Sequence, residues 1–187
     1  MTDIKINNLL EQIDITHILN EQLDKALENI IKIIDIYDNK QFINLIITNF
    51  NHNTLNRLLY KMSESKSIYL INFQLIIYAR LNELSAIKNI IEQSGANEIS
   101  LAIIETDNVE IINYLLNCKM DDEIKENTIK QSIEKACNNG INSILILTFY
   151  IHKFGKKYIP FMIDYIQKNH ISSLGNFIEY INVILKE

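Results

Sequence analysis

The sequence predicts an all-α fold of about nine to eleven short helices without a sheet. Apolar residues recur every three to four positions along most of the 187-residue chain, which is the period of an amphipathic helix. The chain contains only one proline and four glycines, so short polar residues must mark most of the turns. Because 48% of the residues are hydrophobic and the net charge is −5, the chain can bury enough apolar surface to fold.

The expected helices follow one another with short gaps. The first has a broad apolar stripe from Ile18 to Tyr37 with no strand-like alternation. The other expected helices span 42–47, 55–62, 68–79, 84–91, 109–116, 124–136, 144–154, 159–166 and 174–185.

Short polar residues stand where several of these helices begin. Asn53 precedes the segment 54–62, Asp107 or Asn108 stands before 109–116, and Asn142 or Ser143 stands before 144–154. Their side chains can accept hydrogen bonds from the free amides of a first helical turn. These signals favour a helix even for the segment ILILTFYI, whose β-branched residues would also suit a strand.

Three segments of the chain are similar to one another, which indicates an internal repeat. They span 78–96, 103–119 and 136–153, and each contains a helix end, a short polar turn and an apolar second helix. If Leu84, Val109 and Asn142 are equivalent, the intervals are about 25 and about 33 residues, within the range of helical repeat proteins. One helix pair buries only one face, so such units must stack on their neighbours.

These segments resemble the ankyrin repeat. The run 107–116, DNVEIINYLL, is similar to the family's second helix, 136–140, ACNNG, to the turn that ends its first helix, and 95–97, GAN, to the turn after the second. No segment has the family's Thr-Pro-Leu-His start, and Asn142 stands where the family prefers Leu. With its Ile-, Asn- and Lys-rich composition, the chain is similar to degenerate ankyrin arrays encoded by large AT-rich DNA viruses and by some intracellular microbes.

The resemblance implies stacked antiparallel helix pairs that form a short solenoid. It implies a single domain, 1–187, with an N-terminal cap at 1–35, repeats at 36–154 and a C-terminal cap at 155–187. In such an array the turn tips and the first helices bind a protein partner.

Composition argues against several other classes. Cys118 and Cys137 are too few for a disulfide framework and form no CxxC pair, so reduced thiols in a cytoplasm are expected. The N-terminus lacks the features of a signal peptide, and the longest apolar stretch covers 8 residues, where a membrane span needs about 20. A pI near 5.4 with interspersed charges argues against a nucleic-acid partner.

Motifs of catalysis and metal binding are largely missing. The sequence has no glycine-rich phosphate loop, GxSxG or HExxH motif, and its four histidines are scattered. The acidic run 121–123 is interpreted as the start of a helix, with a carboxylate pair or cation site as the alternative. The cluster 152–158 carries three lysines and two aromatic residues around Gly155. It is interpreted as a turn with Gly155 at the helix C-cap, and a contact with a protein or with phosphate groups is left open.

The sequence therefore predicts a non-catalytic protein-interaction module, an adaptor or host-interaction factor, without metal or cofactor. A compact all-α effector similar to viral apoptosis regulators, with a helix-binding groove, is the alternative, and an enzyme with an unrecognised site is a third. Whether the chain forms homo-oligomers is left open. The candidate protein-binding residues are Asn82, Glu83, Asn97, Asp107, Asn108, Asn139, Lys153, Lys156 and Lys157.

Overall fold

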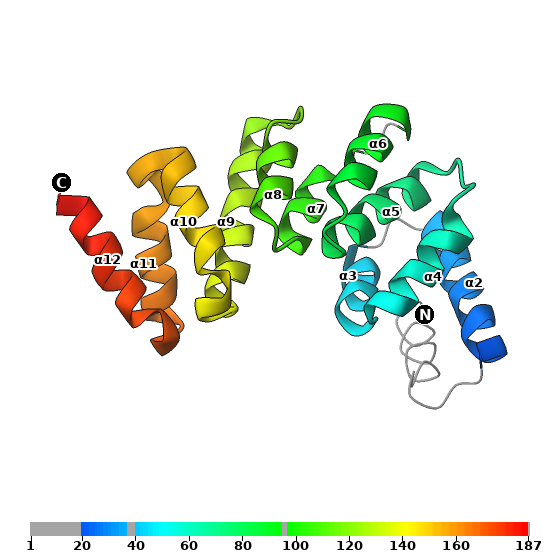
Figure 1. The fold of residues 1–187 in the computed structure, drawn as a ribbon, viewed down its shortest axis with the longest axis horizontal. Coiled ribbons are helices and arrows are strands. Elements are labelled where there is room, and N and C mark those ends of the chain that lie inside the picture. The colour runs from blue at the N-terminus through cyan, green and yellow to red at the C-terminus, as the bar shows by residue number, and fades with distance from the viewer. Residues whose placement is uncertain (1–19, 37–39, 95–96, 187) are drawn as a thin grey trace. The chain divides into compact units, whose positions relative to one another are not determined.

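The computed structural model describes residues 20–36, 40–94 and 97–186, and every regular element among them is a helix (Figure 1). The prediction of an all-α fold is thereby confirmed. Residues 1–19, which include His17 and most of the expected N-terminal cap, lie outside the described residues, as do 37–39 and the Gly95-Ala96 pair. Contacts between Cα atoms divide the chain into two compact units, which are described one at a time.

Unit 1 comprises residues up to Leu81 together with Ser85–Glu98. Its helices are α2 (Asn20–Ile36), α3 (Lys40–Asn49), α4 (His52–Met62), α5 (Ile68–Arg80) and, from Ser85 onward, α6 (Leu84–Ser94). The helix α5 contacts α2, α3 and α4 and is apolar around most of its circumference, as expected for a central helix. Its one buried amide, Gln74, donates from Nε2 to the carbonyl of Met62 at 2.7 Å, so burial leaves this group hydrogen-bonded.

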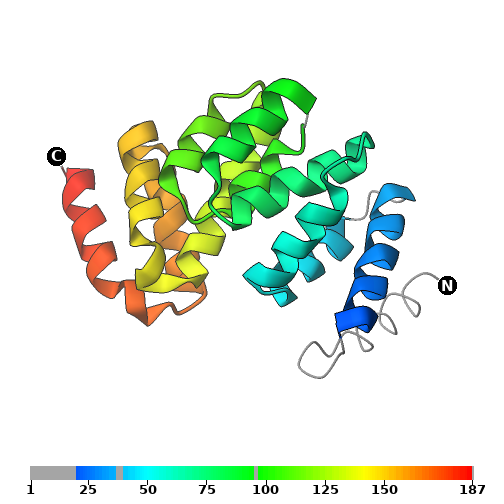
Figure 2. The same cartoon turned by 45° about the vertical axis from the view of Figure 1, so that its right-hand side comes forward.

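Unit 2 comprises Asn82–Leu84 and the residues from Ile99 onward. Its helices are α7 (Ile99–Glu105), α8 (Val109–Leu116), α9 (Asp122–Asn138), α10 (Ile144–Phe154), α11 (Ile159–Lys168) and α12 (Gly175–Lys186), with 3₁₀ segments η1 (Gly140–Ser143), η2 (Gly155–Tyr158) and η3 (Ser172–Leu174). The helix α9 packs against α7, α10 and α11, and α8 packs against α7 and α10. At the C-terminal end of the chain α10, α11 and α12 lie close to one another in both views, with α12 outermost (Figures 1 and 2).

The packing in unit 2 alternates along the chain. The odd-numbered helices α7, α9 and α11 contact one another in sequence, and the even-numbered helices α8 and α10 contact each other. Connections of a few residues link α7 to α8 and α9 to α10, as in helical hairpins. In unit 2 the first helix of one pair therefore contacts the first helix of the next pair, and the second helix α8 contacts the second helix α10.

The structure differs from the sequence prediction at the starts of α4 and α10, at α7 and in the 3₁₀ segments. The cap of α4 is Asn51, whose Oδ1 accepts from the backbone N of Thr54 at 3.0 Å; the expected cap, Asn53, lies inside the helix. Ser143 directly precedes α10 but makes no capping bond, because η1 runs into the helix and its Ile141 carbonyl accepts from the N of Ile144. The helix α7 was expected only as a helix end, and the 3₁₀ segments were not expected.

Candidate interaction surface

Two turns of unit 2 are joined by a side-chain hydrogen bond. Asn82 adopts a left-handed backbone conformation, φ +62°, which asparagine tolerates better than most residues. Its Oδ1 accepts from the hydroxyl of Thr106, which follows α7, at 3.0 Å. The Thr106 Oγ1 also accepts from the backbone N of Asn108 at 3.1 Å. The turn at Asn82 is therefore held beside the turn that leads from α7 to α8.

The C-terminal ends of α7, α9 and α11 are joined in a similar way. The Lys135 Nζ, in the last turn of α9, donates to the carbonyl of Ile104 at 2.8 Å and lies 3.0 Å from Glu105 Oε2. The C-terminal end of a helix carries a partial negative charge, so a cation near its last carbonyls is electrostatically favourable. Asn138 Nδ2, at the end of α9, donates to the hydroxyl of Tyr165 in α11 at 3.0 Å. The bonded residues form a series that we call the turn row, comprising Asn82, Glu105, Thr106, Lys135, Asn138 and Tyr165.

The turn row brings together five of the nine candidate binding residues. Those that lie on it or directly beside it are Asn82, Glu83, Asp107, Asn108 and Asn139. All are exposed except Asn108, which is half-buried. Its Oδ1 accepts from the backbone N of Glu110 at 2.8 Å and of Ile111 at 3.3 Å, so this oxygen caps α8. Four side chains at the row are thus accessible to a partner.

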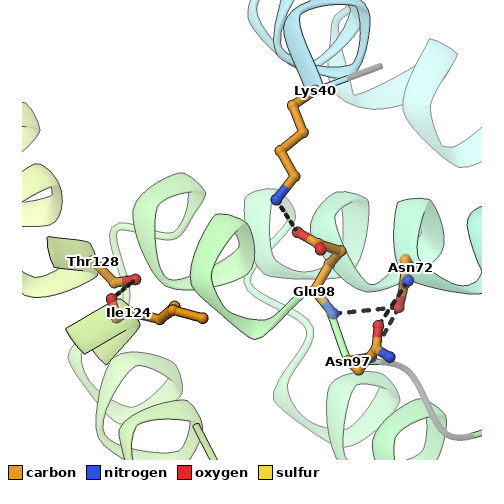
Figure 3. Close-up of polar contacts among 6 residues, drawn as sticks. All are labelled: Lys40, Asn72, Asn97, Glu98, Ile124 and Thr128. Carbon is orange, nitrogen blue, oxygen red and sulfur yellow. Dashed lines mark hydrogen bonds and ion pairs between the residues drawn. The ribbon is translucent and has the colours of Figure 1, made fainter. Parts of the chain in front are cut away.

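Asn97 lies in unit 1 and is engaged by Asn72 of α5 (Figure 3). Its backbone N donates to Asn72 Oδ1 at 2.8 Å, and Asn72 Nδ2 donates to Asn97 Oδ1 at 2.9 Å. The neighbouring Glu98 pairs through Oε2 with Lys40 Nζ at 3.1 Å. These bonds hold Asn97 against α5 within unit 1, whereas the turn row belongs to unit 2.

Lys153, Lys156 and Lys157 lie at the opposite end of α10 from Asn139. An 11-residue helix is about 16 Å long, so these lysines and the turn row do not form one patch. Gly155 stands at the C-cap of α10 with φ +61°, which confirms the predicted turn. The Lys157 Nζ lies 2.6 Å from Glu126 Oε2, and their hydrogen bond raises the pKa of the lysine and lowers that of the carboxyl.

The acidic run begins α9, as the sequence predicts. Asp121 accepts from the backbone N of Glu123 at 2.9 Å and of Ile124 at 3.4 Å, and Asp122 and Glu123 occupy the first helical turn. One turn later the Thr128 hydroxyl donates to the Ile124 carbonyl at 2.7 Å (Figure 3). Among the described residues no three His, Cys, Asp or Glu side chains are grouped so that they could hold a metal ion.

The two cysteines have environments that suppress thiolate chemistry. Cys137 is fully buried, and burial, with a smaller contribution from the negative charge of Glu134, raises its pKa to about 12. Burial also raises the pKa of the half-buried Cys118 thiol, whose Sγ lies 3.6 Å from the carbonyl of Tyr114. Since the thiolate is the nucleophile, neither side chain is poised for covalent catalysis. Cys137 packs in the core, as expected from its small-residue position.

Sequence reasoning did not identify a set of apolar side chains that are exposed in the structure. Leu145 in α10 is 73% exposed, Ile141 just before it is 65% exposed and Tyr60 in α4 is 82% exposed. The available signal was the excess of apolar residues in 144–154: one helix face cannot bury them all, so some must lie on the surface.

Comparison of the chain with protein-family models, curated proteins and solved structures gives no match. The resemblance to the ankyrin repeat therefore remains a prediction from the residues quoted above. None of the helices in the described ranges combines the length and the hydropathy that a membrane span requires.

Proposed function

We propose that the chain is a non-catalytic, ankyrin-like protein-interaction module that binds a protein partner along the turn row. The main observation that supports this proposal is that hydrogen bonds link successive turns, so that the exposed polar side chains of these turns lie along one row. Asn82, Glu83 and Asp107 are presented in this way at one end of the series, and Asn139 further along it. A surface whose backbone is already ordered loses little conformational entropy when a partner binds.

The packing of unit 2 supports the same proposal. The contacts of α9 with α7 and α11, and of α8 with α10, are those expected when helix pairs stack. The cross-turn bonds join residues one repeat length apart: the bonded pair Asn82 and Thr106 is separated by 24 residues, and Lys135 and Ile104 by 31. A repeat interface is extended along the array, so a partner would contact several turns at once.

Site-resolved photo-crosslinking tests the proposal. A photoreactive phenylalanine analogue is placed at Asp107 and, separately, at Asn139; the control is the exposed Asn127 near the start of α9. We expect positions 107 and 139 to cross-link to the same protein in native cells, and position 127 not to do so. Equal cross-linking from all three positions, or none from the two positions at the row, would contradict the proposal.

A charge-reversal pair gives an independent measurement. Glu83→Lys with Asp107→Lys should reduce affinity for the captured protein by about tenfold or more, because both side chains lie in the proposed interface. Glu92→Lys with Glu179→Lys changes the net charge by the same amount at exposed positions outside the turn row and should leave affinity unchanged.

A further inference from the structure

The outer side of α10 combines an exposed apolar face with a basic end. Leu145 is 73% exposed, Phe149 is half-buried one turn later, and His152 is exposed a further turn on. Residues at this spacing share one face of a helix. The residues that α10 buries, Ile146, Leu147, Tyr150 and Ile151, are a different set. Ile141, 65% exposed, precedes the face by four residues.

The C-terminal end of this face carries two lysines that form no ion pair with a residue that the structure describes. Lys153 Nζ donates to the neutral Asn113 Oδ1 at 2.6 Å and lies 5.8 Å from the centroid of the Phe149 ring. Lys156 is exposed and makes no ion pair with a residue that the structure describes. Lys157, in contrast, is paired with Glu126. Two cations therefore lie at one end of the apolar face in a chain whose net charge is −5.

We infer that this face, from Leu145 to Lys156, is a second docking site and that it binds an amphipathic helix with acidic residues at one end. The apolar side of such a helix would pack on Leu145 and Phe149, and its carboxylates would lie near Lys153 and Lys156. In helix-on-helix docking of this kind, the bound helix contacts its partner through side chains spaced three and four residues apart. The 11 residues of α10 offer about 16 Å, enough for three turns of a bound helix.

The chemistry of the face favours this occupant over nucleic acid. Single-stranded nucleic acid needs exposed aromatic rings for base stacking and a track of free cations for its phosphates. The central exposed residue here is aliphatic, Leu145, and the neighbouring ring of Phe149 lies partly buried beneath a lysine. Burying Leu145 against another apolar side chain also removes exposed hydrophobic surface from water, which phosphate contacts would not do.

Binding of two designed peptides to the full chain tests the inference. The acidic probe is an 18-residue helical peptide with leucines at positions 4, 8, 11 and 15 and three glutamates in its first turn. The basic probe is identical except for three lysines in place of the glutamates. Fluorescence anisotropy should show the acidic probe binding at least tenfold more tightly, with the difference shrinking as salt concentration rises.

Variants of the chain locate the site. Leu145→Lys should weaken binding of the acidic probe by about tenfold or more, and Lys153→Glu with Lys156→Glu should reverse the preference between the probes. Ile124→Lys, at a 53% exposed position of α9, is the matched control and should leave binding unchanged. The turn-row pair Glu83→Lys with Asp107→Lys should also leave it unchanged, so failure of this inference is distinguishable from failure of the proposed function.

Other results would overturn the inference. Equal affinity for the two probes, or full affinity in Leu145→Lys, would show that the face does not bind an acidic helix. Displacement of the acidic probe by a single-stranded oligonucleotide, with no effect of Leu145→Lys on oligonucleotide binding, would assign the lysines to phosphate contacts. Self-association in sedimentation experiments that Leu145→Lys abolishes would assign the face to a second copy of the chain. Circular dichroism confirms that each variant remains folded.

Discussion

Three glycines of unit 2 allow a graded test of backbone conformation and packing. Gly140 has φ +64°, and a Cβ added there would lie 2.6 Å from the Ser173 Oγ. Gly155 has φ +61°, but an added Cβ would meet no atom within 4 Å. Gly175 has helical dihedrals, φ −55° and ψ −50°, and also has open space around an added Cβ. We predict that substitution by alanine destabilises the folded protein at positions 140 and 155 and stabilises it at position 175.

The magnitudes follow from these geometries. A left-handed conformation costs an L-residue roughly 1–2 kcal/mol, which applies to Gly140→Ala. Gly155 has ψ −141°, close to a region that is almost exclusive to glycine, so its substitution should cost about 1–3 kcal/mol. At Gly140 the Ser173 side chain must also move; it is exposed and can rotate, so this adds a few tenths of a kcal/mol or more. Gly175→Ala should gain about 0.4–1 kcal/mol, because alanine restricts the unfolded chain.

Urea unfolding followed by circular dichroism measures the free energy of unfolding of each variant relative to the unsubstituted chain. All three positions lie in unit 2, so the same transition reports on each variant. In a Ser173→Ala background the cost of Gly140→Ala should decrease and that of Gly155→Ala should not. If Gly140→Ala were as stable as Gly175→Ala, or if Ser173→Ala left its cost unchanged, the geometry of the turn between α9 and α10 would be wrong.

Three further predictions concern bonds within unit 2. Lys135→Met removes the hydrogen bond to the Ile104 carbonyl of α7 and leaves the mostly buried Glu105 carboxylate without its ion pair, so it should lower the free energy of unfolding by about 2 kcal/mol. Lys130→Met removes a more exposed ion pair and should have a much smaller effect. Asn108→Ala removes the cap of α8 and should cost about 1 kcal/mol in urea unfolding, while Asp107→Ala next to it should be nearly neutral. The pKa of Cys137 is raised from 9.0 to about 12, so the folded thiol keeps its proton while the unfolded one loses it; the free energy of unfolding should fall between about pH 9 and 12, and less steeply in Cys137→Ala.

Two helices could be placed from the sequence to the residue. The expected bounds 109–116 and 144–154 are those of α8 and α10, because a helical apolar period was flanked by short polar residues. The helix α7 was missed because its seven residues make only two turns and carry no strong capping signal. At α4 two asparagines flank His52, and sequence alone could not show that Asn51 adopts the extended conformation of a cap.

The sequence indicated the candidate binding residues as polar turn residues, but it did not indicate which of their turns lie side by side. Polar turn residues such as Asn82, Asp107 and Asn139 were recognisable, and helix packing brings their turns into one series. Nothing in the sequence near Asn97 indicated its reciprocal bonds with Asn72, which lies 25 residues away. The sequence also did not indicate that Leu145 is exposed, because an apolar residue in an apolar helix is expected in the core unless the neighbouring helices are known.

The sequence by itself determined the all-α class, the polar turns, a cap of α8 at Asp107 or Asn108 and the acidic start of α9. These features depend on hydrogen bonds and side-chain spacing within about four residues, which the order of residues specifies directly. Only the tertiary structure decided which turns lie side by side and which apolar face of α10 remains uncovered. Those outcomes depend on contacts between helices about 25–35 residues apart, where the fit of many side chains, and not a local pattern, sets what is buried.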